Sequence, residues 1–428
     1  MNDILSYLMR FLSGEDDAPA GGPPRRTIGY TADPGLFGRY DLVITPSGFF
    51  DDGVYGAPAS LPSLPLQEID GLPFLFGRAG EEMAGSTPVI HADLVASAYF
   101  LLTRYEEMMR PGVRDVHGRF PGKESLPFRA GFIHRPVVDG YSRLIRSRLG
   151  LPPQPEGIRR VMLTHDVDAP FLYRSWKGLV RSMLTDKRGA LPSLRSKFGR
   201  VEEDPYYTFP WIFEQDGRAL AAGGKEVRSV FFFKSGGGRM AEDKPHYSLK
   251  SPGVRRLIRS VQEHGGEIGL HASYEAGLNP RLIVKEKESL ERSVGTTVSF
   301  NRHHFLASRE PEDMDYLEEA GITDDFTLGY ADVAGFRLGT SRPVRRINPR
   351  TRRLTSLRLH PLTVMDCTLE DSRYMGLSPG EASDYCLRLI RETGKACGEL
   401  SLLWHNSSLG GCYHRELYSS LITTLTGI

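Results

Sequence analysis

The chain has 428 residues, of which 40% are hydrophobic and 25% are charged. This length exceeds what one ordinary hydrophobic core accommodates, so we expect about two domains. The formal net charge of +1 argues against a general role in binding nucleic acid or a membrane surface.

The cysteines and the amino-terminal apolar stretch bear on the compartment of the protein. The four cysteines show neither C-x-x-C spacing nor the density of a disulfide scaffold, which favours reduced, packed thiols. The apolar stretch 4–12 is interrupted by Arg10 and is too short to span a bilayer, and no small-residue cleavage site follows it. An amphipathic surface helix is the alternative for this stretch. The sequence therefore predicts a cytoplasmic protein without an integral membrane segment.

The composition of the first third of the chain predicts a flexible segment, a small domain and a linker, in this order. Residues 1–27 are expected to be a flexible amino-terminal segment, because 14–26 are rich in Gly, Pro, Asp and Arg. Residues 28–150 mix short apolar runs with one clear helix near 91–107, which predicts a small accessory α/β domain. The proline-rich stretch 152–155 is typical of a linker.

From 158 to 428 the pattern alternates strand and helix, which is typical of a parallel α/β sheet or barrel. About seven strand–helix units favour a distorted (β/α) barrel. Helices are expected at 379–397, where Ser378 and Glu381 form a capping box, and at 311–320. The segment 185–204 has no period and is either a lid or a surface loop. The expected strands are 160–163, 229–233, 267–270, 298–300, 323–327, 362–366 and 400–404.

The motif Thr-His-Asp-Val-Asp at 164–168 ends the first of these strands. Because side chains alternate along a strand, Thr164, Asp166 and Asp168 are expected on one face and His165 on the other. Two carboxylates crowded at the end of a parallel strand, where α/β folds bind ligands, favour a bound cation.

Other strand ends carry residues of similar chemistry. His271 follows the strand at 267–270, Arg302 and His304 follow the strand at 298–300, and His405 follows the strand at 400–404. A barrel gathers the carboxyl ends of its strands at one mouth, so we expect these side chains to converge with the two aspartates.

The strings THDVD, IGLHASY, NRHHF and LLWHNSSL, in this order, resemble the polysaccharide deacetylases, carbohydrate esterases that remove N- or O-acetyl groups from sugars. The resemblance covers about 158–428 and implies a distorted (β/α) barrel, a divalent metal that is often zinc, and hydrolysis of an acetyl amide or ester. Three earlier strings, FLLTRYEEM, DVHGRF and HRPVVDGY, resemble a module that precedes the catalytic domain in a bacterial subgroup of these proteins. No function is implied for that module.

The resemblance also implies roles for single residues. Asp166 matches the general base, and Arg302 matches the arginine that steadies it. Asp168 and His271 match metal ligands, and His405 matches the histidine that serves as general acid.

The sequence departs from the family pattern at one ligand position. The family usually carries a second histidine four residues after the first, and this chain has Glu275 there. The third metal ligand is therefore either Glu275 or, as we prefer, His304 from the neighbouring motif. If neither binds, the site is poor in metal and the protein is weakly active or inactive.

Substrate contacts are less specific in the sequence. Tyr274 and Trp404 are candidates for stacking on a sugar ring, and Asp366 or Asp324 for binding sugar hydroxyls or orienting His405. The arginine-rich stretch 342–353 is either a solvated basic hairpin or a grip for a diphosphate or acidic glycan.

Together these observations predict a metal-dependent hydrolase, with no organic cofactor, that removes acetyl groups from a sugar or polysaccharide precursor. The alternative is a deacetylase-like protein that binds glycans or acts as a scaffold without catalysis. The expected partner is a carbohydrate and not a nucleic acid. The sequence carries no signal for the oligomeric state.

Overall fold

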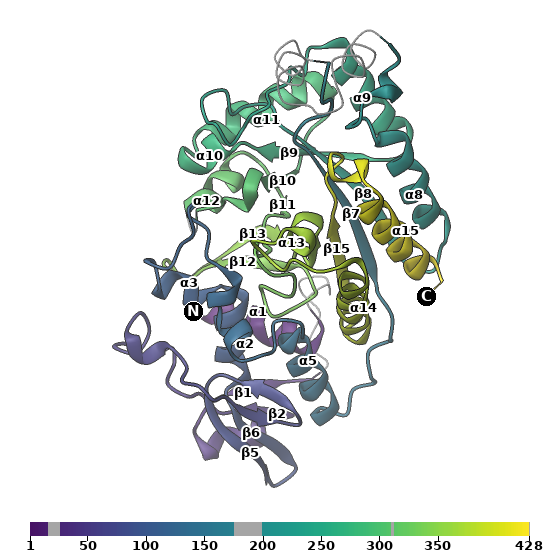
Figure 1. Ribbon diagram of the computed structural model, residues 1–428. Helices are drawn as coiled ribbons and strands as arrows, with labels where there is room; N and C mark the ends of the chain where they lie inside the picture. The colour runs from purple at the N-terminus through teal and green to yellow at the C-terminus, as the bar shows by residue number, and fades with distance from the viewer. Residues whose placement is uncertain (16–25, 175–198, 310–311, 428) are drawn as a thin grey trace.

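The computed structural model describes residues 1–15, 26–174, 199–309 and 312–427. Most of the segment 185–204, predicted as a lid or a surface loop, lies outside these residues. The α/β class predicted from the sequence is confirmed (Figure 1). Within the described residues, no helix has the length and apolar character needed to cross a membrane.

The amino-terminal part is built on a four-stranded sheet in the order β1-β2-β6-β5, in which only β5 runs antiparallel to its neighbour. The strands β3 and β4 form a separate antiparallel pair. The elements of this part are α1 (Asn2–Ser13), β1 (Ile28–Tyr30), β2 (Leu42–Ile44), β3 (Gln67–Ile69), β4 (Leu72–Phe74), β5 (Gly77–Ala84), β6 (Thr87–Ala92), α2 (Leu94–Leu102), α3 (Tyr105–Met109), α4 (Leu126–Arg129) and α5 (Val137–Arg148).

Two expectations for this part need correction. Residues 2–13 form helix α1, the alternative left open for the apolar stretch, but it is neither flexible nor on the surface, because its apolar side chains, Leu8 and Phe11 among them, are buried against α2 and α5. The helix predicted near 91–107 is two helices, α2 and α3, because Arg104 between them takes a left-handed backbone conformation with φ 53°. The predicted domain boundaries at 28, 150 and 158 stay predictions.

The rest of the chain forms a nine-stranded sheet in the order β12-β13-β11-β10-β9-β8-β7-β15-β14. All neighbouring strands are parallel except β12 and β13. Its elements are β7 (Arg160–Val167), α8 (Phe209–Ala221), β8 (Glu226–Phe233), α9 (Pro252–Glu263), β9 (Glu267–Ala272), α10 (Tyr274–Leu278), α11 (Leu282–Val294), β10 (Phe300–His303), α12 (Glu312–Glu319), β11 (Asp324–Asp325), β12 (Val344–Asn348), β13 (Arg353–Leu359), β14 (Val364–Met365), α13 (Asp366–Glu370), α14 (Pro379–Lys395), β15 (Glu399–Leu403) and α15 (Cys412–Thr426).

All seven predicted strands have a counterpart in this sheet, but the sheet differs in two respects from the expected distorted barrel of about seven strands. Two strands that were not among the predicted ones, β12 and β13, join the sheet, and they overlap the arginine-rich stretch 342–353. The pairings of the described strands also leave β12 and β14 at the two edges, so the sheet is curled and open (Figure 1).

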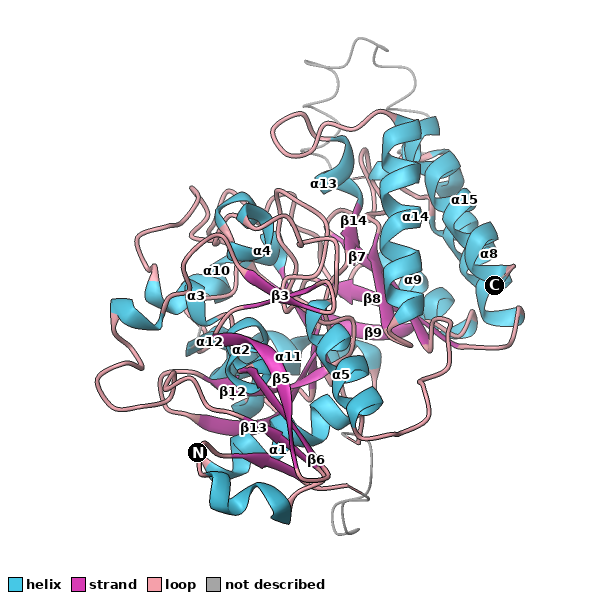
Figure 2. Ribbon diagram, turned by 90° about the horizontal axis from the view of Figure 1, so that it is seen from below, coloured by secondary structure: helices cyan, strands magenta, loops and turns pink. Residues whose placement is uncertain are grey.

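Helices cover the sheet for reasons visible in the sequence. In α9, Val254, Leu257, Ile258 and Val261 recur at helical spacing and are all buried. Helix α14 begins with the predicted capping box, in which Ser378 and Glu381 satisfy each other's backbone N–H groups. Helices α14 and α15 pack together, as do α15 and α8, along one side of the sheet (Figure 2).

The arginines of 342–353 are not all solvated, nor are all of them free to grip an anion. Arg342 is 7% exposed, and its Nε donates to Asp139 Oδ1 of α5 over 3.0 Å. Arg346 is 1% exposed and is paired with Asp315 of α12. Arg342 and Arg346 therefore belong neither to a solvated hairpin nor to an anion-binding site, and both expectations are wrong for them. They join the sheet to elements packed on it.

The buried His360, which directly follows β13, predicts that the stability of the fold depends on pH. His360 donates from Nδ1 to Glu399 Oε1 over 2.6 Å and from Nε2 to Asp324 Oδ1 over 2.9 Å. Burial alone would lower the pKa of His360, but the charges and hydrogen bonds of Glu399 and Asp324 outweigh it and raise the pKa to about 9. Because this pKa exceeds the unfolded value of about 6.5, the stabilisation is complete below about pH 6.5 and is lost as the pH rises through about 9.

We therefore expect the free energy of unfolding to fall by up to about 3 kcal/mol from this group between pH 6 and 9.5. Urea unfolding of the wild-type protein and of His360→Gln at both pH values measures it, because the variant lacks the titrating imidazole. The fall should be smaller in the variant. An equal fall in both proteins would contradict the assignment.

Candidate active site

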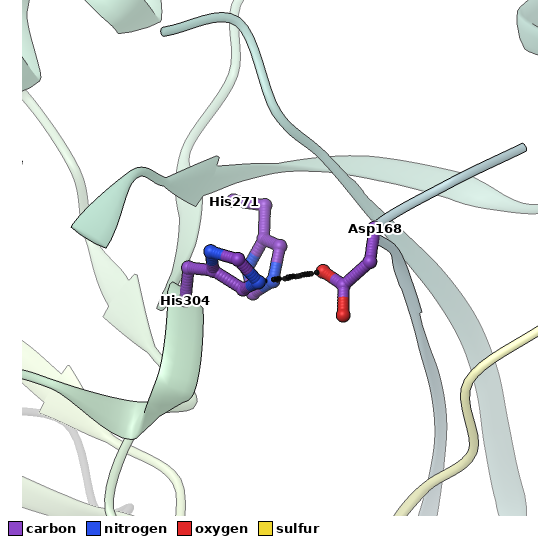
Figure 3. A group of neighbouring side chains, drawn as sticks. All are labelled: Asp168, His271 and His304. Atoms are coloured by element: carbon purple, nitrogen blue, oxygen red, sulfur yellow. Dashed lines mark hydrogen bonds and ion pairs between the residues drawn. The ribbon is translucent and has the colours of Figure 1, made fainter. Parts of the chain in front are cut away.

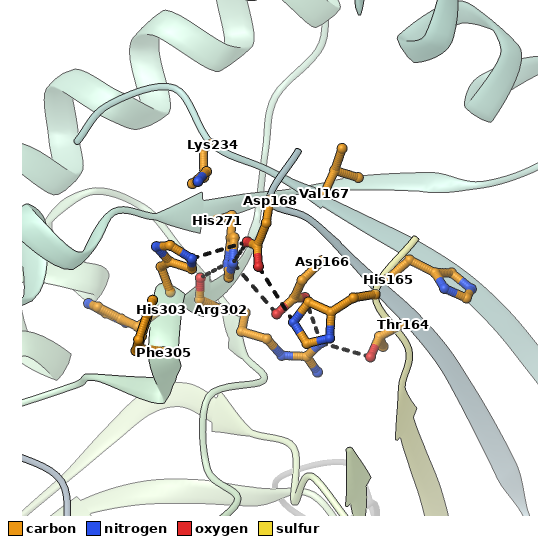
Figure 4. Close-up of polar contacts among 12 residues, drawn as sticks. Thr164, His165, Asp166, Val167, Asp168, Lys234, His271, Arg302, His303 and Phe305 are labelled. Carbon is orange, nitrogen blue, oxygen red and sulfur yellow. Dashed lines mark hydrogen bonds and ion pairs between the residues drawn. The ribbon is translucent and has the colours of Figure 1, made fainter. Parts of the chain in front are cut away.

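Strand β7 presents its side chains on alternate faces, as predicted (Figure 4). Thr164 and Asp166 both accept hydrogen bonds from Arg302 Nη1, over 2.8 and 3.0 Å. His165 lies on the other face, where its Nε2 is 3.1 Å from Asp216 Oδ2. The strand therefore separates a polar face that forms the site from a face that packs under the helices.

Asp168, directly after β7, lies against two histidines from neighbouring strand ends (Figure 3). Its Oδ1 is 3.1 Å from Nε2 of His271 on β9 and 3.2 Å from Nε2 of His304, which follows β10. One donor atom from each of the three residues lies within 4.8 Å of the others, which makes them a candidate metal site.

The donor set fits a zinc ion. Ligands about 2.0–2.1 Å from one tetrahedral centre lie about 3.3 Å apart, close to the observed 3.1 and 3.2 Å. The other ring nitrogens are occupied, because Nδ1 of His271 is 2.9 Å from the Arg302 carbonyl oxygen and Nδ1 of His304 is 2.9 Å from Asp243 Oδ1. Such contacts fix metal-binding histidines with Nε2 turned to the ion.

The electrostatics of this group favour a cation. Burial by itself would raise the pKa of Asp168, but the charge of His304 and hydrogen bonds from both histidines hold it well below the usual range. Burial lowers the pKa of His304, and the charge of Asp168 more than reverses this and raises it. The half-buried carboxylate is thus kept ionised at a place where positive charge is stabilised.

Glu275 and His304, the two candidates for the third metal ligand, differ in position. Glu275 turns its carboxylate to Arg239, with Oε1 3.9 Å from Nε and Oε2 accepting from the backbone N–H over 3.4 Å. It is absent from the donor groups found among the described residues, whereas His304 belongs to one. Glu275 thus lies beside an arginine, whereas His304, directly after β10, lies beside Asp168.

Asp243 was missed by the sequence analysis. It lies in the loop after β8 and, besides contacting His304, accepts hydrogen bonds from the backbone N–H of Tyr274 over 2.8 Å and of Glu275 over 3.0 Å. Lys234, at the end of β8, donates from Nζ to the carbonyl oxygen of Asp243 over 3.0 Å. Because Asp243 follows no strand directly and belongs to no motif, the sequence offers no signal for it.

Asp166 is held beside the candidate metal site. Its Oδ1 accepts from Arg302, and its Oδ2 lies 3.6 Å from Nε2 of His271. Arg302 is fully buried, donates from Nε to the Phe326 carbonyl oxygen over 3.0 Å and packs over the ring of Phe232. The arginine therefore fixes the direction of this carboxylate.

His405 borders the site from the other side, with Nε2 3.7 Å from Asp168 Oδ2. Asp366 accepts from Nδ1 of His405 over 2.8 Å and from its backbone N–H over 2.8 Å. Burial alone would lower the pKa of His405, but the charge of Asp366 raises it well above its ordinary value. Asp366 is 0% exposed and contacts His405, so of its two expected roles the structure favours the orientation of His405 and disfavours the binding of sugar hydroxyls. Asp324 is paired with His360, away from His405.

The two aromatic candidates differ in position. Trp404 is 0% exposed and packs with its ring centroid 5.2 Å from that of Tyr418. It belongs to the core under the helices, so the expectation that it stacks on a sugar is wrong. Tyr274 is 7% exposed and lies beside the site, with its ring 5.5 Å from that of Phe305. Its stacking on a sugar stays a proposal.

A loop of the amino-terminal part contacts Phe305, the residue directly after His304. Arg119 donates from Nη1 to the carbonyl oxygen of Phe305 over 2.9 Å, and the ring of His117 lies 4.8 Å from that of Phe305. Phe305 and Leu306 both have positive φ, 61° and 53°. The backbone directly after His304 is therefore strained and is held by a side chain from the first third of the chain.

Comparisons with known proteins give weak likenesses. Residues 2–150 match a family model described as "Family of unknown function (DUF7033)". No curated protein sequence matches the chain. A Mycobacterium smegmatis structure provisionally named a polysaccharide deacetylase is similar at 17% identity and a TM-score of 0.40, over 63% of this chain and 88% of the other.

Two further structures are similar at a TM-score of 0.33. One is a mutant of a CE4 family pseudoenzyme with restored enzymatic activity, at 14% identity over 65% of this chain and 69% of the other. The second is the chitin deacetylase of the fungal pathogen Colletotrichum lindemuthianum, at 12% identity over 64% and 86%. Because these TM-scores are low, the similar structures carry no argument about chemistry. We infer the chemistry of the site from its own side chains.

Proposed function

We propose that this protein is a metal-dependent hydrolase that removes acetyl groups from a sugar or polysaccharide precursor in the cytoplasm. The observation that carries the proposal is the meeting of Asp168, His271 and His304 at adjacent strand ends, with Asp166 and His405 on either side. A binding protein needs no such combination of metal ligands, carboxylate and histidine. The order of the four sequence motifs supports the same function.

Asp168, His271 and His304 would hold the metal, which when bound supplies a Lewis acid that polarises the acetyl carbonyl and acidifies water. Asp166 takes the proton of the attacking water at one carboxylate oxygen. Arg302 orients that carboxylate through the hydrogen bond to Oδ1, which leaves Oδ2 on the side of His271.

His405 protonates the departing group from Nε2, while Asp366 retains the proton on Nδ1. An amine or an alkoxide leaves far more easily when it is protonated, so this step is needed for both an acetyl amide and an alkyl ester. Tyr274 supplies an apolar surface beside the site on which a sugar ring can stack.

Metal analysis tests the candidate metal site, on which the proposed function depends. Wild-type protein loaded with zinc and dialysed is expected to keep one tightly held equivalent. Asp168→Ala and His304→Ala should each weaken binding by at least about 100-fold, because each removes one of three ligands. Glu275→Ala is the matched control and should bind like wild type, because its carboxylate faces Arg239.

Mass spectrometry measures the number of metal ions held per chain, and competition with a chelator measures the affinity for the metal. Absence of a tight equivalent in the wild-type protein would overturn the hydrolase and favour the glycan-binding or scaffolding alternative. Loss of metal in Glu275→Ala would show that the ligand set is wrong.

A further inference from the structure

A second group of metal-binding atoms lies behind His405. Nδ1 of His405 is 2.8 Å from Asp366 Oδ1 and 3.7 Å from Cys367 Sγ, and this sulfur is 3.3 Å from the same carboxylate oxygen. The three atoms thus meet on the side of the imidazole ring opposite to Nε2, which faces Asp168. The proposed reaction gives Cys367 no part.

We propose that Asp366, Cys367 and His405 form a second, weaker zinc site whose occupation inhibits the enzyme. Binding at this site does not depend on the proposed function, whereas the inhibition rests on it. Thiolate, imidazole and carboxylate are the ligand types that zinc takes in proteins.

The geometry is close to that of a preformed site. For ligands about 2.0–2.3 Å from one tetrahedral zinc, the separations are about 3.3–3.6 Å, and the observed ones are 2.8, 3.3 and 3.7 Å. Cys367 is half-buried and the His405 side chain is 14% exposed, whereas Asp366 is fully buried.

The site is weaker than the first because the ion must displace groups already in place. The thiol proton of Cys367 and the Nδ1 proton of His405 both pass to water when the sulfur and nitrogen bind zinc. The ion also replaces the hydrogen bond between His405 and Asp366 and lies near the positive charge of the first metal. Occupation is therefore expected only when zinc exceeds one equivalent.

Inhibition follows from the role of His405. In the proposed reaction the imidazolium gives up its Nε2 proton and remains a neutral ring with a proton on Nδ1. When zinc holds Nδ1, loss of the Nε2 proton would leave an imidazolate, which makes the ring a much poorer acid at neutral pH. The step that protonates the leaving group is therefore blocked, while the first metal site is intact.

Cobalt titration tests the binding directly, because a thiolate bound to Co²⁺ gives a charge-transfer absorption that imidazole and carboxylate ligands do not. The second equivalent of Co²⁺ added to the full-length protein should produce this band. It should be absent in Cys367→Ala and present in Cys412→Ala, the control for an exposed cysteine elsewhere. It should also persist in His304→Ala, which damages only the first site.

Zinc inhibition tests the consequence. Micromolar zinc in excess of one equivalent should lower acetate release by wild-type protein at least tenfold, and Cys367→Ala should keep its basal activity and lose the inhibition. A band that does not depend on Cys367, or equal inhibition of both proteins, would overturn the proposal. If the protein proves not to be a hydrolase, the cobalt band in His304→Ala still decides whether the second site exists.

Discussion

Replacement of Asp166 by asparagine is expected to lower kcat/KM for acetate release by about 1,000-fold, because the amide cannot accept the proton of the attacking water. Asparagine has the same shape, and its side-chain oxygen can accept the hydrogen bond that Arg302 donates to Oδ1. The fold and the tightly held metal should therefore be retained. Release of acetate from acetylated oligosaccharides, measured beside metal content, checks the prediction.

The matched control is Asp384→Asn, the same chemical change at an exposed position of α14. It should leave both activity and metal content unchanged. Activity of Asp166→Asn within tenfold of wild type would refute the assignment of this residue as the base. Loss of the metal in that variant would instead make Asp166 a ligand.

Replacement of His405 by glutamine should separate substrates by their leaving group. Acetate release from an acetyl amide or alkyl ester should fall by about 100- to 1,000-fold, because the leaving nitrogen or oxygen is no longer protonated. Hydrolysis of 4-nitrophenyl acetate should fall by less than tenfold, because the phenolate leaves without a proton. Steady-state kinetics on both substrates measures the difference.

Two comparisons sharpen this result. Asp366→Asn should show the same selectivity in weaker form, because Asp366 acts through His405. Asp166→Asn should slow both substrates equally, because both need an activated water. An equal loss on both substrates in His405→Gln would contradict the general-acid role and favour a structural one.

The residues that meet at the site could be predicted because they obey strand geometry. Asp166 and Asp168 were placed by the alternation of one strand. His271 and Arg302 were placed by the expectation that parallel strands end together, and these two residues are direct partners in the register of β9 and β10. Local sequence was sufficient wherever the position depended on a strand and its end.

The parts that the sequence did not predict depend on contacts between distant segments. Asp243 contacts His304 across 61 positions, and Arg342 meets Asp139 across 203. Helix α1 is ordered by burial against α2 and α5, which a composition rich in glycine and proline just after it conceals. Trp404 lies next to His405 in sequence but is fully buried, and only packing reveals that difference.

The contact of Arg119 with the Phe305 carbonyl links the beginning of the chain to the residue after a proposed metal ligand. A left-handed backbone at a residue such as phenylalanine costs about 1–2 kcal/mol, and here two such residues follow each other. Removing residues 1–150 would therefore take away a contact beside His304 as well as uncover apolar surface. A fragment without residues 1–150 is therefore expected to hold the backbone after His304 less firmly than the full chain does.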